Sequence, residues 1–208
     1  LGGKSASIVL EDADLDIAVD GAVTGGFQNG GQVCVAGSRV LVARAIYDEF
    51  LQRLERRMKD LVVGYQMMPG TKIGPLASAK QLETVQKYVD IGKAEGARVL
   101  CGGQRLKVPG FDAGCYFEPT VFVDVKNSMR IAREEIFGPV LVVLPFGSDD
   151  EAIAMTNDSE YGLAGAVWSR DAARARRVAE RVRTGTMWIN EVAVLSDFLP
   201  FGGIKSSG

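Results

Sequence analysis

The 208-residue chain contains no histidine, and this absence excludes several kinds of active site. Ser-His and Cys-His pairs, histidine general bases and histidine-containing zinc sites all depend on the imidazole ring. A catalytic centre within this chain must therefore move protons with other groups, and we expect no metal site.

The sequence also has few cysteines, no long apolar run and little net charge. Its three cysteines form no C-x-x-C pair, which is typical of free thiols in a reducing compartment and predicts a cytoplasmic protein. No apolar run approaches the roughly 20 residues that span a bilayer. The formal net charge is -2, and even the densest basic cluster, Arg174 to Arg183, has the helical spacing of a solvated helix face. We therefore expect neither a membrane nor a nucleic acid as partner.

Apolar periodicity alternates between strand and helix along the chain. Strands are expected at 7–10, 39–43, 98–100, 116–125, 139–145, 163–168 and 186–189. Apolar residues at helical spacing predict helices over 15–22, 47–61, 82–89, 149–157 and 171–182. Asp12 or Asp14 can cap the first helix, and capping boxes begin at Ser78 and Ser148. This alternation predicts an α/β fold, a mostly parallel twisted sheet flanked by helices, with no linker that would divide the chain into two domains.

Two phosphate-binding motifs can be set aside. Gly3-Lys4-Ser5 has the lysine and hydroxyl that end a P-loop, but such a loop leads into a helix, whereas residues 7–10 are predicted to be strand. No G-x-G-x-x-G motif occurs, so the chain lacks the dinucleotide-binding fingerprint of that type.

Cys34 lies in a glycine-rich, nearly uncharged stretch between a predicted helix and a predicted strand. It is either a small buried hydrophobic residue or a reactive thiol. A thiol needs no histidine if backbone amides stabilise its thiolate, and amides in such a place can also hold an oxyanion. Cys101 is predicted to lie in the core, and Cys115 in an exposed loop.

Two further motifs have both a plain and a functional interpretation. Glu134 and Glu135 precede Phe137-Gly138-Pro139, and adjacent acids are ordinarily solvated. The same pattern can instead present a carboxylate and an aromatic ring to a sugar and its base. Pro200 to Gly203 is either a rigid turn or the wall of a pocket.

Taken in order, these segments resemble the aldehyde dehydrogenase superfamily. Leu1 to Lys4 matches the Glu-Leu-Gly-Gly-Lys motif of the family without its first residue, and Gly31 to Cys34 resembles the segment that carries the nucleophile. Glu134 to Pro139 resembles the segment that contacts the cofactor, and Pro200 to Gly208 resembles the late signature. The resemblance covers essentially the whole chain.

The resemblance implies oxidation of an aldehyde to a carboxylic acid with NAD or NADP. In the family scheme, Cys34 attacks the aldehyde to give a thiohemiacetal, hydride leaves to the nicotinamide, and the resulting thioester is hydrolysed. Glu135 is then expected to bind the nicotinamide ribose, with Phe137 near the nicotinamide. The backbone amide of the cysteine and an asparagine side chain hold the oxyanion, and a glutamate activates water.

The same resemblance places that glutamate immediately before Leu1, and the asparagine, the cofactor lysine and the nucleotide-binding domain further upstream. We therefore expect residues 1–208 to be a single catalytic domain of a longer enzyme, inactive alone in the redox reaction. Family members form dimers and tetramers, so a homodimer or homotetramer is expected.

By position, the substrate channel is expected to be flanked by Val33, Val35, Leu195 and Phe201. Their apolar character favours an uncharged aliphatic or aromatic aldehyde, and Asp197 argues against a carboxylate substrate. Three alternatives stay open: a relative that transfers the acyl group to CoA, a thiol hydrolase, and a non-catalytic protein that retains the fold.

Overall fold

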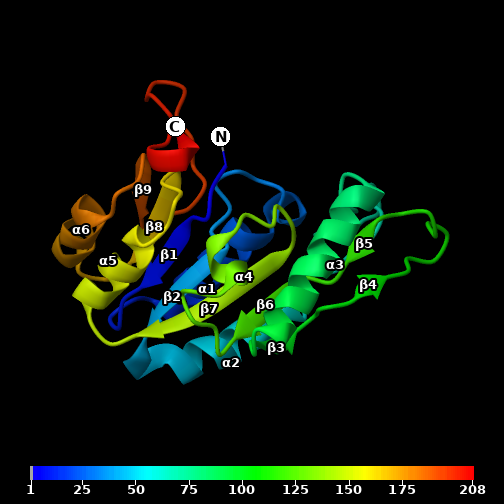
Figure 1. Ribbon diagram of the computed structural model, residues 1–208, viewed down its shortest axis with the longest axis horizontal. Coiled ribbons are helices and arrows are strands. Elements are labelled where there is room, and N and C mark those ends of the chain that lie inside the picture. The colour runs from blue at the N-terminus through cyan, green and yellow to red at the C-terminus, as the bar shows by residue number, and fades with distance from the viewer. Residues whose placement is uncertain (1) are drawn as a thin grey trace.

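A seven-stranded sheet forms the centre of the computed structural model, which describes residues 2–208, so that Leu1 of the first matched segment lies outside the described residues. Its strand order is β3-β6-β7-β2-β1-β8-β9 (Figure 1). The strands are β1 (Ala6–Val9), β2 (Arg39–Ala43), β3 (Arg98–Cys101), β6 (Thr120–Val123), β7 (Val140–Phe146), β8 (Ala164–Trp168) and β9 (Thr186–Ile189). All neighbours pair in parallel except β3, which is antiparallel to β6.

Helices cover both faces of this sheet, as predicted. They are α1 (Leu15–Phe27), α2 (Tyr47–Met58), α3 (Ala79–Ala94), α4 (Arg130–Arg133), α5 (Asp149–Asn157) and α6 (Ala172–Arg181). Alternate residues of β7 serve the two faces, because side chains along a strand alternate in direction. Leu141 and Val143 pack in the core with α1 and α2, whereas Val140 and Val142 pack in the core with α3 and α4. A third cluster lies under α5 and α6.

The prediction of one continuous strand over 116–125 is wrong, because the structure has two separate strands there. The chain there forms β5 (Tyr116–Phe117) and β6, and β5 pairs with β4 (Arg105–Leu106) in a separate two-stranded ribbon. Pro119 lies between β5 and β6 and has no N–H to donate to a ladder. The hydroxyl of Thr120 accepts a hydrogen bond from the N–H of Gly103 at 2.9 Å, which joins the start of β6 to the turn after β3.

Both capping boxes are only half formed. Ser78 and Ser148 cap α3 and α5 as predicted, and their hydroxyls accept from the N–H groups of Gln81 and Glu151. The reciprocal bonds are absent from the described residues: the carboxylate of Glu151 accepts from Gly147 N–H at 2.6 Å instead. The cap of α1 is Asp14.

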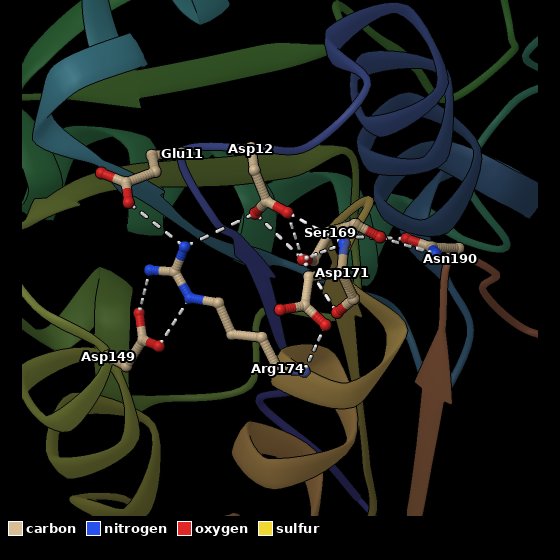
Figure 2. A network of polar contacts seen from close by, with 7 residues as sticks. All are labelled: Glu11, Asp12, Asp149, Ser169, Asp171, Arg174 and Asn190. Atoms are coloured by element: carbon tan, nitrogen blue, oxygen red, sulfur yellow. Dashed lines mark hydrogen bonds and ion pairs between the residues drawn. The ribbon is translucent and has the colours of Figure 1, made fainter.

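A polar network closes the carboxyl-terminal edge of the sheet (Figure 2). Asp12, Ser169 and Asn190, which follow β1, β8 and β9, are joined there by hydrogen bonds. Arg174 extends this network through two bonds to the Asp149 carboxylate, at 2.8 and 2.7 Å, and its side chain is 25% exposed. Arg174 thus departs from the predicted solvated helix face, whereas the other arginines of that cluster, Arg176, Arg177, Arg181 and Arg183, are exposed as predicted.

No helix in the described part of the chain combines the length and the apolar character that crossing a membrane requires.

Candidate functional site

The predicted site residues gather at the amino-terminal edge of the sheet, opposite the network of Figure 2. Gly3 precedes β1, Cys34 precedes β2, and Glu135 and Phe137 precede β7. The two ends of the chain lie at this edge as well (Figure 1), and the hydroxyl of Ser207 donates to Gly2 O at 2.6 Å. Ligands of open α/β sheets usually bind at the carboxyl ends of strands, so this placement departs from the general pattern.

Gly2 and Gly3 allow Cys34 and Glu135 to approach the same short segment of backbone. Gly3 N–H donates to Glu135 Oε1 at 3.2 Å. A Cβ atom on Gly3 would lie 2.5 Å from the carbonyl oxygen of Cys34, and one on Gly2 would lie 2.7 Å from Glu135 Oε2. At Gly3 the neighbour is backbone, so only glycine allows this approach to Cys34. The first motif of the sequence thus connects the second and third motifs in space.

The loop that carries Cys34 turns through three successive left-handed residues. Asn29, Gly30 and Gly31 have φ angles of 52°, 64° and 71°. A Cβ on Gly31 would overlap the carbonyl oxygen of Gly138 and would lie 2.5 Å from its carbonyl carbon. The glycine-rich stretch therefore permits the Cys34 loop to contact the segment that precedes β7.

Cys34 itself is half-buried against a small apolar cluster. This cluster consists of Val35, Leu163 and Ala164, and Trp188 and Ala193 pack against it as well. Within residues 2–208, no backbone acceptor is found for the N–H of Cys34, although the turn around it is closed by a bond from Ala36 N–H to Val33 O at 3.0 Å. A backbone N–H without an acceptor, next to the thiol, can donate a hydrogen bond to an oxyanion that forms when the thiol adds to a carbonyl group.

The other two thiols have different surroundings. Cys101 packs against the core beneath α2, and burial raises its pKa to about 11, so it stays protonated at neutral pH. Cys115 is half-buried against the cluster under α3, which is less exposed than its predicted loop suggested.

Phe137 is held in an unusual conformation at this edge. Its φ angle is 54° and its side chain is 42% exposed. The Gln81 side-chain amide donates to Ile136 O at 2.9 Å and to Phe137 O at 2.7 Å. Val33, Glu135 and Phe137 line one small cavity of about 10 Å³ between the two segments. Gln81 thus positions the segment, a role that sequence reasoning missed because its spacing from Ser78 indicated only a cap.

The resemblance given above implies that this segment contacts NAD, so Gln81→Met is expected to raise the KM for NAD of the full-length enzyme by up to about 30-fold, since two hydrogen bonds of about 1 kcal/mol each would be lost. Steady-state kinetics with varied NAD would measure it. Gln86→Met is the matched control, because Gln86 lies on the same helix and bonds only Asp90 at the surface. An unchanged KM in Gln81→Met would show that the segment holds its conformation without this side chain.

Glu134 is not simply solvated, contrary to the plain interpretation of the acid pair. Arg130 donates two hydrogen bonds to its carboxylate at 2.6 and 2.9 Å, and the Tyr88 hydroxyl donates a third at 2.7 Å. The arginine is the largest cause that lowers the pKa of Glu134 from 4.5 to about 2. Glu134 therefore anchors α4 to α3, while Glu135 faces the glycines.

A carboxyl group whose pKa is lower in the folded state than in the unfolded state stabilises the folded state at pH values above its unfolded pKa. The contribution of Glu134 is thus expected in full above about pH 4.5, with loss as the pH falls towards 2. The Glu134 side chain is 38% exposed, so solvent screening limits the effect to about 1 kcal/mol or less. Urea unfolding at pH 5 and pH 3 should show a smaller pH dependence in Glu134→Gln than in the parent, with the exposed Glu83→Gln as control. If Glu134→Gln and the parent showed the same pH dependence of unfolding, Glu134 would not contribute to stability through its lowered pKa.

The four residues predicted to flank a substrate channel do not share one cavity in the structure. Val33 lines the small cavity beside Glu135, and Val35 is buried in the cluster around Leu163. Leu195 and Phe201 belong to the loop after β9, and both side chains are exposed, Leu195 by 59%. Other large apolar side chains of this loop are exposed too, namely Val194, Phe198 and Leu199. The channel stays a prediction.

Comparison with known proteins gives a consistent result. A betaine aldehyde dehydrogenase of Mesorhizobium japonicum is 49% identical over 208 residues, which are 100% of this chain and 43% of that protein. One from Brucella melitensis has the same identity and coverage. The chain thus spans less than half the length of the curated relatives it matches.

Solved structures agree with the fold. A betaine aldehyde dehydrogenase mutant of Staphylococcus aureus, in complex with NAD+ and with a modified cysteine, superposes with a TM-score of 0.98 at 45% identity. It matches 100% of this chain and 42% of its own. An aldehyde dehydrogenase mutant of Bacillus cereus gives a TM-score of 0.94 at 46% identity, over 99% of this chain and 41% of that one. The family model described as "Aldehyde dehydrogenase family" matches residues 1–208, and the chain belongs to that family.

Proposed function

We propose that residues 1–208 form the catalytic domain of an enzyme that oxidises an aldehyde to a carboxylic acid with NAD. The observation that carries this proposal is the contact at Gly3, whose N–H bonds Glu135 while its Cα faces the carbonyl of Cys34. The NAD+ complex of the Staphylococcus aureus relative supports the choice of cofactor.

Cys34 is the proposed nucleophile. Its sulfur adds to the carbonyl carbon and gives a thiohemiacetal, to whose oxygen the free backbone N–H of Cys34 can donate a hydrogen bond. Loss of a hydride and a proton then gives a thioester, and water releases the acid and restores the thiol. NAD, when bound, supplies the acceptor for that hydride.

The residues present fit such a cofactor. Glu135 offers a carboxylate acceptor for the ribose hydroxyls, and Phe137 offers an exposed ring on the same segment. The small cavity that this segment shares with Val33 places both next to the Cys34 loop. In this proposal the chain orients the cofactor through Glu135 and Phe137 and binds the acyl group through Cys34.

The test is a product assay on the full-length enzyme. Incubation with an aldehyde and NAD should give carboxylic acid and NADH in equal amounts. Addition of CoA should leave the acid as product; if acyl-CoA formed instead, the acyl-transferring alternative would replace this proposal. Absence of NADH with a panel of aldehydes would leave the non-catalytic alternative.

The substrate is proposed to be an aldehyde without a carboxylate. The exposed apolar side chains of Leu195 and Phe201 favour apolar groups, and Asp197 on the same loop disfavours anions. The relatives are named for betaine aldehyde, a cation, which agrees with the argument from Asp197 but departs from the uncharged aldehyde that the apolar side chains favour. We would compare kcat/KM for betaine aldehyde, its neutral isostere 3,3-dimethylbutanal, and succinate semialdehyde. Preference for succinate semialdehyde would refute the proposal.

We also retain the homodimer or homotetramer and the cytoplasmic location as proposals. All three thiols are free, which supports a reducing compartment. Light scattering on the full-length enzyme would measure its oligomeric state.

A further inference from the structure

A second cavity at the same edge of the sheet contains four polar atoms without partners. It lies between the start of β1, the end of α5 and the segment before β9, and has about 10 Å³ of free volume. Lys4 Nζ, Ser5 Oγ, Thr156 Oγ1 and Thr184 Oγ1 are all buried and form no hydrogen bond within the described part of the chain. All four residues line the cavity. Buried polar atoms are normally satisfied, so this concentration in one place needs an explanation.

The cavity has an excess of positive charge. Lys4 and Arg39 are each only 2% exposed, and neither forms an ion pair with a carboxylate among residues 2–208. The Arg39 guanidinium donates only to neutral oxygens, those of Lys4, Asn127, Met155 and Thr156. Arg183 also lines the cavity, and among residues 2–208 no aspartate or glutamate does.

Buried charges without partners are costly, and a buried amine responds by losing its proton or by acquiring a counter-ion. Burial is the largest cause that lowers the pKa of Lys4 to about 7, and Arg39 acts in the same direction. Glu135 and Glu134 oppose this shift without contacting the amine. A counter-ion in the cavity would compensate the charge of Lys4 and of Arg39 together.

We propose that this cavity binds one small anion, a halide such as chloride, between the ammonium of Lys4 and the hydroxyls of Ser5, Thr156 and Thr184. A cation does not fit, because cations require carboxylate or carbonyl ligands, and the charged side chains that line the cavity, Lys4, Arg39 and Arg183, are all positive. The free volume admits a single water-sized particle, which excludes phosphate and carboxylates. The alternative is a neutral amine that holds one water molecule.

Long-wavelength diffraction separates these two cases, because chlorine scatters anomalously there and oxygen does not. Crystals of the full-length enzyme grown in sodium chloride should show an anomalous peak beside Lys4 Nζ, and crystals grown in sodium gluconate should not. A cavity that shows only a water, with no anomalous signal in chloride, would overturn the proposal.

Thermal unfolding gives a solution test at constant ionic strength. Replacing gluconate by chloride should raise the Tm of the enzyme by about 2–4 °C, because the ion binds the folded state. The rise in Tm should vanish in Lys4→Met and become smaller in Thr184→Val. Because valine has nearly the shape of threonine, Thr184→Val provides the test if Lys4→Met does not fold. Lys126→Met, an exposed lysine, should keep the full rise. An equal rise in Thr184→Val and Lys126→Met would show that chloride acts elsewhere.

Discussion

Replacement of Cys34 by serine is expected to reduce aldehyde oxidation by the full-length enzyme at least about 10³-fold, with little change in stability. A serine hydroxyl has no histidine to act as its base, because the chain contains none. Because Cys34 is only half-buried, the change in unfolding free energy should stay within about 1 kcal/mol. Steady-state kinetics and thermal unfolding of the same preparation measure both.

The other two cysteines provide the controls. Cys101→Ser puts a hydroxyl against the core beneath α2, so it should lower stability and leave kcat unchanged. Cys115→Ser should change neither quantity much. If Cys101→Ser or Cys115→Ser removed activity as fully as Cys34→Ser, the nucleophile would be wrongly assigned.

Chemical labelling adds a measurement that does not need turnover. Iodoacetamide modification at a series of pH values, with the site found by mass spectrometry, compares the three thiols in one sample. We expect Cys34 to react at a lower pH than Cys101, whose pKa burial raises to about 11. If iodoacetamide labelled Cys34 no faster than Cys101, the loop around Cys34 would not activate its thiol.

The fold was largely predictable because its elements are specified locally. The five residues of β2 and the four of β9 have the predicted bounds, since each is an apolar run between turn residues. The antiparallel direction of β3 was not predictable, because it depends on how a chain of moderate length returns to the sheet edge. The break at Pro119 could have been predicted from the missing N–H alone.

The candidate site was predictable as four separate motifs but not as a constellation. Sequence reasoning placed Cys34, Glu135 and Phe137 in suitable local settings, and the family resemblance suggested their roles. The contacts among them are non-local: Gly3 and Glu135 are 132 residues apart in the chain. Gln81 shows the same limit, since a residue with helix-capping spacing donates instead to a segment 55 residues further on.

The second large effect is expected from Gly31→Ala, with Gly30→Ala as its matched control. Both glycines have positive φ, 64° at Gly30 and 71° at Gly31, so an alanine at either position should cost about 1–2 kcal/mol of stability from backbone strain. The two positions differ in their surroundings. A Cβ on Gly30 would meet nothing nearer than the flexible end of Gln32 at 3.4 Å, whereas a Cβ on Gly31 would overlap the backbone of Gly138.

Gly31→Ala must therefore separate the Cys34 loop from the segment that holds Glu135 and Phe137, and a displacement of the order of 1 Å at a reacting centre costs about 10²-fold in rate. We expect kcat/KM to fall by about that factor in Gly31→Ala, with a further roughly 1–3 kcal/mol of destabilisation from the overlap. Gly30→Ala should keep most of its activity, because it carries the strain without the overlap. Kinetics and urea unfolding of the two variants measure the difference. Equal losses of activity would mean that backbone strain alone disturbs Cys34, and the contact between Gly31 and Gly138 would then have no part in aligning the site.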